Sequence, residues 1–133
     1  MSVVYVDSSA LLKRVVVEAE STALRELLRE AAGAGHLLTA SSIAWLEVWR
    51  SLRRAAAADV AGLTEAAFSG VAEFPLTNDL VVRARRVGDD HLRSLDALHL
   101  ASAIGVQADV MVTYDERLAT ASRLVGMTVK SPT

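Results

Sequence analysis

The sequence predicts an α/β fold in which a small parallel sheet of about five strands carries helices on both faces. Short apolar runs alternate with segments of helical periodicity along the whole chain, which is typical of a parallel sheet with helical crossovers. The first run, residues 3–6, is apolar at consecutive positions, as expected of a strand buried on both faces. A length of 133 residues, 52% of them hydrophobic, fits one domain over residues 1–133.

A short helix is expected directly after the first strand, and a longer amphipathic helix after that. Residues 8–17 can form the short helix, with Ser8 or Ser9 as its N-cap. Residues 21–33 form the longer one, because leucine and alanine recur there at i, i+3, i+4 and i+7 before a terminating glycine.

Caps, apolar runs and breaking residues locate the remaining elements. Ser41 and Ser42 cap a long helix, and Asp59 restarts the chain as another. Pro75 makes the third strand an edge strand, since proline cannot donate to a ladder. The remaining strands are expected at residues 36–39, 74–76, 109–113 and 127–129, and the remaining helices at residues 41–58, 59–71, 78–87, 94–106 and 115–124.

Composition excludes several classes of function. A net charge of −2 offers no broad basic field for nucleic acid, and the absence of cysteine excludes disulfides and thiolate sites. No apolar run approaches the ~18 residues of a membrane span, so we expect no membrane association. The absence of cysteine fits a cytoplasmic location. The mean hydropathy of +0.31 indicates a well-buried sheet plus a surface that a partner covers.

Two carboxylates follow expected strands directly. Asp7 ends the first strand, and open α/β sheets bind ligands outside the carboxyl ends of their strands. Asp115 follows the strand at residues 109–113 in the same way, with Thr113 as a supporting hydroxyl. The two acids would meet if their strands were neighbours at a switch point. Taken alone, each fits a turn or helix-capping role equally well.

Asp96 lies in the first turn of a helix whose apolar side chains cover every side. Such a helix is buried, and a buried carboxylate must be paired, protonated or bound to a metal. The alternative is an acid that only complements the helix dipole, worth about 0.3–1 kcal/mol. His99, one turn later, is expected to be a core residue or to support a neighbouring group rather than to bind metal.

Glu47 is harder to interpret from its pattern. Trp45, Trp49 and Leu52 belong to an apolar stripe roughly opposite Glu47 on the same helix. Periodicity alone therefore predicts a solvated glutamate paired with Arg50 at i+3. The stripe is either part of the core or a docking face for a partner.

Taken together, these segments resemble a PIN-domain endoribonuclease, and within that family a VapC-type toxin of a bacterial toxin–antitoxin pair. The resemblance covers essentially the whole chain in the family's order and spacing, although residues 55–93 carry no family motif. Its carriers are Val4-Tyr5-Val6-Asp7-Ser8-Ser9-Ala10-Leu11, Glu47 with Arg50, Leu95-Asp96-Ala97-Leu98-His99-Leu100-Ala101-Ser102-Ala103 and Val112-Thr113-Tyr114-Asp115-Glu116-Arg117-Leu118.

The resemblance implies a PIN-like three-layer fold and a metal-dependent endoribonuclease with an acidic site at the carboxyl ends of the strands. Clustered carboxylates repel one another unless a cation holds them, and their hard oxygen atoms suit Mg²⁺ or Mn²⁺. An RNA substrate, a cognate antitoxin and a homodimer are also implied. The implied site consists of Asp7, Glu47, Asp96 and Asp115, the supporting hydroxyls are those of Ser8 and Thr113, and the candidate substrate-binding arginines are Arg14, Arg50, Arg54 and Arg117.

Two other functions remain open at this level. The chain could be a PIN nuclease of RNA processing without a toxin role. It could also be a non-catalytic α/β binding module whose acids merely cap helices. Titration with Mn²⁺ separates the second alternative from a nuclease, because a set of helix caps should show no site-specific uptake.

Overall fold

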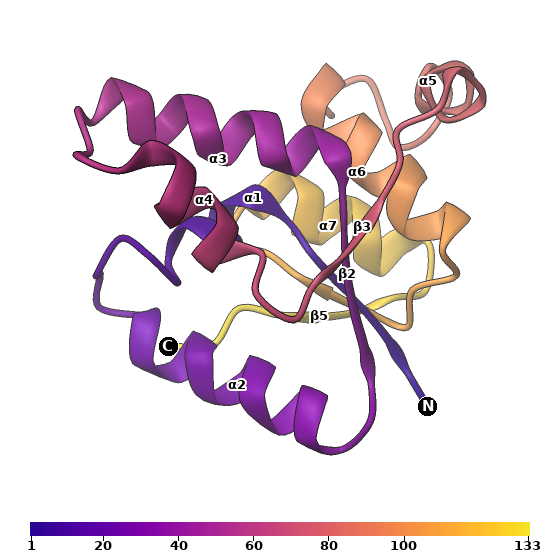
Figure 1. The fold of residues 1–133 in the computed structure, drawn as a ribbon. Helices are drawn as coiled ribbons and strands as arrows, with labels where there is room; N and C mark the ends of the chain where they lie inside the picture. The colour runs from indigo at the N-terminus through magenta and orange to yellow at the C-terminus, as the bar shows by residue number, and fades with distance from the viewer.

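The computed structural model describes residues 1–133 and contains a five-stranded sheet in the order β3-β2-β1-β4-β5. All neighbouring strands are parallel, so the predicted parallel α/β sheet is confirmed. The chain first builds outward from β1 to one side and then adds β4 and β5 on the other (Figure 1). The topological switch point therefore lies between β1 and β4. The strands are β1 (Val3–Val6), β2 (Leu37–Ser41), β3 (Ala72–Phe74), β4 (Val110–Val112) and β5 (Thr128–Lys130).

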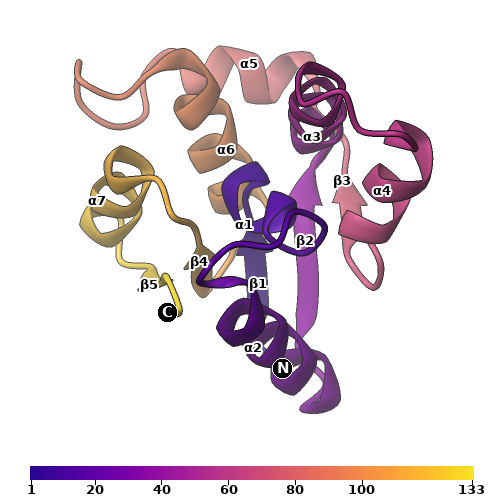
Figure 2. The same ribbon diagram turned by 90° about the vertical axis from the view of Figure 1, so that its left-hand side faces the viewer.

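Seven helices fill the connections and cover both faces of the sheet (Figures 1 and 2). Helices α6 and α7 lie on one face, and α2 lies on the other. None of them has the length and apolar character needed to cross a membrane. The helices are α1 (Ser8–Leu12), α2 (Ser21–Gly33), α3 (Ser42–Arg54), α4 (Val60–Ala67), α5 (Asn78–Ala84), α6 (Ser94–Gly105) and α7 (Glu116–Leu124).

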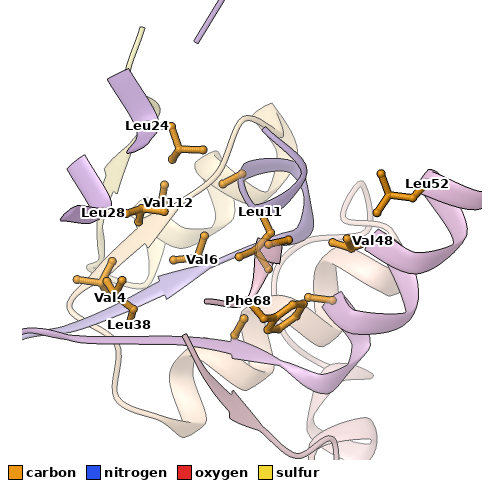
Figure 3. Packing of buried hydrophobic residues seen from close by; sticks show 14 residues of the cluster. Val4, Val6, Leu11, Leu24, Leu28, Leu38, Val48, Leu52, Phe68 and Val112 are labelled. Atoms are coloured by element: carbon orange, nitrogen blue, oxygen red, sulfur yellow. The ribbon is translucent and has the colours of Figure 1, made fainter. Parts of the chain in front are cut away.

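The central strand β1 divides the core into two clusters, because successive side chains of a strand point to opposite faces. Val4 and Val6 face a cluster built with α1, α2, α3 and α4, part of which is shown in Figure 3. Tyr5 faces the second cluster, which includes Leu100 of α6 and Leu118 of α7. Strand β1 is thus covered on both faces, as its continuous apolar run predicts.

Two of the observed helices end earlier than expected. Helix α1 ends at Leu12 instead of about residue 17, and a run of three valines follows, whose β-branched side chains disfavour helix. Helix α3 ends at Arg54 instead of residue 58, and Ala56 takes a left-handed φ of 54° after it. The expected serine cap of α1 was wrong, since Asp7 itself caps that helix.

Candidate active site

The four predicted acids lie where the carboxyl ends of the strands meet the helices that follow. Asp7 directly follows β1, and Asp115 is the N-cap of α7 after β4. Glu47 belongs to α3, which continues directly from β2, and Asp96 lies in the first turn of α6. The structure thus brings all four acids to one edge of the sheet.

Asp96 lies within electrostatic reach of the other three acids. Partial burial raises the pKa of Asp96 above its ordinary value, and the charges of Asp115, Asp7 and Glu47 raise it further. The charge of His99 acts in the opposite direction. A cluster of acids that raises the pKa of one of its members holds uncompensated negative charge.

Asp7 is the innermost acid, with only 3% of its surface exposed. Ser9 Oγ donates a hydrogen bond to Asp7 Oδ1 at 2.6 Å, and Thr113 Oγ1 donates to Oδ2 at 2.5 Å. The backbone N–H of Ala10 also donates to Oδ1, at 3.0 Å, which is the cap of α1. Both carboxylate oxygens are therefore held in place by donors from the β1–α1 junction and from the end of β4.

The same two hydroxyls join the β1–α1 junction to the loop after β4. Ser9 Oγ accepts from the backbone N–H of Tyr114 at 3.0 Å, and Thr113 Oγ1 accepts from the N–H of Asp115 at 3.0 Å. Each hydroxyl thus donates to Asp7 and accepts from the loop that leads to Asp115. The position of one strand-end acid is in this way coupled to that of the other.

The C-terminal residues secure this loop from outside. Ser131 Oγ donates to the carbonyl of Thr113 at 2.5 Å, and Tyr114 Oη donates to the carbonyl of Pro132 at 2.7 Å. On its other side, Lys13 Nζ lies 4.7 Å from the centre of the Tyr114 ring, in a cation–π arrangement. We call this set of contacts the C-terminal clasp. It fixes the backbone that carries Thr113.

Glu47 is oriented by a buried chain of polar groups. His99 Nε2 lies 2.5 Å from Glu47 Oε1, and His99 Nδ1 lies 2.8 Å from Tyr5 Oη, which also accepts from the N–H of Ser41 at 3.2 Å. Burial disfavours a charged imidazole, but the hydrogen bond and charge of Glu47, together with Asp7 and Asp96, raise the pKa of His99. The predicted Glu47–Arg50 pair was therefore wrong, because Glu47 pairs with His99.

Divalent-cation binding fits the chemistry of these donors. All four acids offer hard carboxylate oxygens of the kind that Mg²⁺ and Mn²⁺ prefer, and their mutual repulsion is what a cation would relieve. No three acidic or imidazole groups converge on a common point as in a finished metal site. Asp7 is held by three hydrogen-bond donors, whereas Asp96 and Asp115 are more exposed.

A cavity of about 260 Å³ adjoins the acids on the side of α3. Glu47 lines it together with Ser8, Arg50 and Arg54. A larger cavity of about 350 Å³ lies between α2 and the sheet, and none of the four acids lines it. The smaller cavity is therefore the one that is relevant to the site.

Only some of the predicted supporting and substrate-binding residues lie at the acidic site. Thr113 contacts Asp7 as expected, but the second hydroxyl is that of Ser9, whereas Ser8 lines the cavity. Arg14 Nη1 donates to the carbonyls of Ala67 and Ser69 at 2.7 and 2.8 Å, so this arginine stabilises the end of α4 instead of serving a substrate. Arg117 is exposed on the first turn of α7, two residues after Asp115.

Sequence reasoning missed Ser9, Tyr5 and Tyr114 as parts of the site. Ser8 and Ser9 have the same chemistry, and only the turn geometry after β1 decides which of them reaches Asp7. The role of Tyr5 could have been predicted, because alternation along the strand places it on the opposite face from Val4 and Val6. That face meets the buried helix that carries His99. The role of Tyr114 could not have been predicted, since its contacts come from segments distant in sequence.

Comparison with protein families and curated proteins gives concordant results. The family model described as "PIN domain" matches residues 4–124. Ribonuclease VapC47 of Mycobacterium tuberculosis (strain CDC 1551 / Oshkosh) is 37% identical over 134 residues, which cover 97% of this chain and 96% of that protein. Ribonuclease VapC46 of Mycobacterium tuberculosis (strain ATCC 25618 / H37Rv) is 37% identical over 142 residues, covering 99% of both chains.

Solved structures share the fold at lower sequence identity. VapC20 of Mycobacterium tuberculosis, described as a sarcin-ricin loop cleaving toxin, aligns with a TM-score of 0.74 and 19% identity over 89% of this chain and 94% of that one. VapBC2 of Rickettsia felis, bound to a promoter DNA fragment, aligns with a TM-score of 0.74 and 10% identity over 98% and 99% of the two chains. A toxin–antitoxin complex from Klebsiella pneumoniae aligns with a TM-score of 0.66 and 18% identity over 98% of both chains.

Asp7→Asn should stabilise the protein at neutral pH when no divalent cation is present. Burial raises the pKa of Asp7, an effect that the charge of His99 and the hydrogen bonds from Ser9, Thr113 and Ala10 oppose. Above pH ~4, where the unfolded chain loses this proton, the native state still binds it, so this group's contribution to stability falls as pH rises through the folded pKa. Asparagine can still cap α1 and carries no charge to bury.

The measurement is urea denaturation of both proteins between pH 4 and 8 in the presence of a chelator. The difference in the free energy of unfolding should grow in favour of Asp7→Asn as pH rises. The matched control is Asp90→Asn at an exposed loop position, which should show no such trend. An Asp7→Asn protein that loses stability relative to the native chain as pH rises would contradict the assignment of Asp7 as a buried, costly charge.

Proposed function

The chain belongs to the PIN-domain family and, within it, to the VapC proteins, and from this premise we propose that it is a metal-dependent endoribonuclease, the toxin of a toxin–antitoxin pair. The observation that carries the proposal is the gathering of four carboxylates, from four separate segments, at the switch point of the sheet. The 37% identity to ribonucleases VapC47 and VapC46 supports RNA as the substrate.

Asp7 and Asp96 are proposed as the principal ligands of Mg²⁺ or Mn²⁺, with Glu47 and Asp115 holding water or a second ion. A divalent cation bound there would neutralise charge at the phosphate and would favour deprotonation of a water molecule. The proposed reaction is hydrolysis of an RNA phosphodiester: a water oxygen attacks phosphorus, and the bond to the departing ribose oxygen breaks.

The protein's own contribution is to hold the acids before RNA arrives. Ser9 and Thr113 fix both oxygens of Asp7, and His99 fixes one oxygen of Glu47. Because these donors come from buried or half-buried positions, little reorganisation is needed when charge develops at the phosphate. His99 acts through Glu47 and is a positioning residue in this scheme.

RNA must approach the acidic edge although the chain carries a net charge of −2. Local cations are therefore proposed to guide it, as phosphate contacts dominate nucleic-acid affinity. Arg50 and Arg54 line the cavity beside Glu47, and Arg117 is exposed close to Asp115 in the chain. These three arginines remain the candidates for binding substrate.

A cognate antitoxin and a second copy of the chain are the proposed protein partners. Structural neighbours of this fold include a toxin–antitoxin complex and VapBC2. The surface offers exposed apolar side chains that fit such contacts, since contiguous apolar patches commonly mark protein interaction sites. They include Trp49 of α3 and Val81 and Val82 of α5.

The purified chain should cleave RNA with Mg²⁺ or Mn²⁺ and should be inactive in chelator. Asp96→Asn should lower the cleavage rate by at least about a hundredfold, because it removes a charged ligand. Asp79→Asn is the matched control, since Asp79 is exposed and pairs only with Arg83 on α5. Unchanged cleavage in chelator, or in Asp96→Asn, would overturn the proposed mechanism.

His99→Phe should lower the cleavage rate and the Mn²⁺ affinity by about 10- to 100-fold, because Glu47 loses the partner that orients it. His99→Gln retains a side-chain donor and should recover part of both. Calorimetric titration with Mn²⁺ and single-turnover cleavage assays measure the two effects. If both variants bind Mn²⁺ as the native chain does, His99 does not position Glu47.

Expression of the chain alone should arrest bacterial growth, and expression of Asp96→Asn should not. Co-expression of the small protein encoded by an adjacent reading frame should restore growth. Growth curves and colony counts after induction measure both outcomes. Harmless expression of a chain that cleaves RNA in vitro would favour a nuclease of RNA processing over a toxin.

A further inference from the structure

The cavity beside Glu47 is bordered by chain neighbours of two other acids. Ser8 directly follows Asp7, and Leu95 directly precedes Asp96, and both side chains line this cavity with Glu47. The cavity, of about 260 Å³, therefore opens next to the acids instead of at a remote surface. A polymer whose phosphodiester lies at the acids would place the adjoining part of its chain here.

Two cations line this cavity without an acidic partner. Arg50 and Arg54 lie three and seven residues after Glu47, so they share one face of α3. The ion pairs of the molecule involve only Lys13, Arg83 and His99 as cationic partners. Arg54 makes one hydrogen bond, to the neutral Ser51 hydroxyl at 3.1 Å. Both guanidinium groups are thus available to an anion.

Apolar side chains form a second kind of wall in the same cavity. Leu46 of α3 and Leu95 of α6 leave 54% and 48% of their surfaces exposed, and both contribute to the lining. Exposed leucines beside two guanidinium groups suit a ligand that is planar and apolar on one part and anionic on another. Guanidinium groups bind phosphate through their fork of donors and stack on planar rings.

We propose that this cavity binds one unstacked nucleotide that flanks the scissile phosphodiester of single-stranded RNA. Its base lies against Leu46 and Leu95, and its phosphate contacts Arg50 and Arg54. Single-stranded segments offer such splayed bases, whereas a duplex does not. The inference rests on the proposed ribonuclease function and adds the place and the residues of a nucleotide site next to the scissile bond.

Binding of mononucleotides tests the cavity without any cleavage. Isotope-labelled native protein is titrated with the four ribonucleoside 5′-monophosphates in chelator, with ribose 5-phosphate and inorganic phosphate as controls. The nucleotides should shift the amide signals of Leu46, Arg50 and Leu95 more than ribose 5-phosphate does. Equal shifts from all of the probes, or none, would overturn the base site.

Steady-state cleavage of a labelled single-stranded RNA tests the arginines. Arg50→Ala and Arg54→Ala should each raise KM about tenfold with a smaller effect on kcat, because they remove ground-state phosphate contacts. Each should also reduce the slope of log KM against log salt by about 0.7. Arg53→Ala on the same helix is the matched control, since Arg53 is exposed outside the cavity, and Arg50→Lys should recover part of the loss.

Abasic substitution tests the apolar wall. Once the cleavage position is mapped, removal of the base next to it should slow cleavage by the native chain, and Leu46→Ala should reduce this discrimination. Leu124→Ala, at a residue that is 77% exposed on α7, should leave it unchanged.

The outcomes distinguish the inference from the proposed function. Cleavage by a chain in which Arg50→Ala and Arg54→Ala behave as Arg53→Ala would overturn the nucleotide site and leave the ribonuclease standing. Absence of cleavage by the native chain would overturn the proposed ribonuclease function. The mononucleotide titration would still show whether the cavity binds a nucleotide. Shifts of the cavity signals with purified antitoxin, and none with nucleotides, would assign the cavity to the protein partner.

Discussion

Burial of one carboxylate at the switch point is the constraint on which the site depends. Asp7 is almost fully enclosed, and a buried charge is costly unless donors surround it. The chain provides three, from Ser9, Thr113 and the N–H of Ala10. The two hydroxyls in turn accept from the loop after β4, so the charge of Asp7 links β1 to β4 beyond their backbone ladder. In the proposed function, this cost to stability is offset because the charge of Asp7 helps to bind a cation.

The remaining acids have fewer hydrogen-bond partners than Asp7. Glu47 is held through His99 to Tyr5, and Tyr5 points away from Val4 and Val6 because strand residues alternate. Asp115 is held as a helix cap through the N–H of Leu118 at 3.0 Å. Asp96 has only its helix for support, and its pKa is raised by burial and by its acidic neighbours. Side-chain support in the site thus decreases from the buried Asp7 to the more exposed Asp96.

Local pattern predicted the sheet and the strand-end acids because both depend on chain order. Continuous apolar strands and intervening helices require parallel pairing, and this places Asp7 and Asp115 at one edge. Glu47 is different, since its helix periodicity points to solvent and its partner His99 lies 52 residues away. Resemblance to a family supplied Glu47, but it also selected Ser8, where the turn geometry selects Ser9. Contacts such as Lys13 over Tyr114 depend on how distant segments pack, which periodicity does not encode.

The C-terminal clasp makes the two ends of the chain unequal. Ser131 and Pro132 contact the loop that carries Thr113, one hydrogen bond away from Asp7, whereas Met1 is 91% exposed at the opposite edge of the sheet. A peptide tag or fused protein attached after Thr133 would pull on the clasp and disturb the acid that it helps to fix. The same addition before Met1 would extend freely into solvent. Purification tags and fluorescent fusions for this protein therefore belong at the N-terminus.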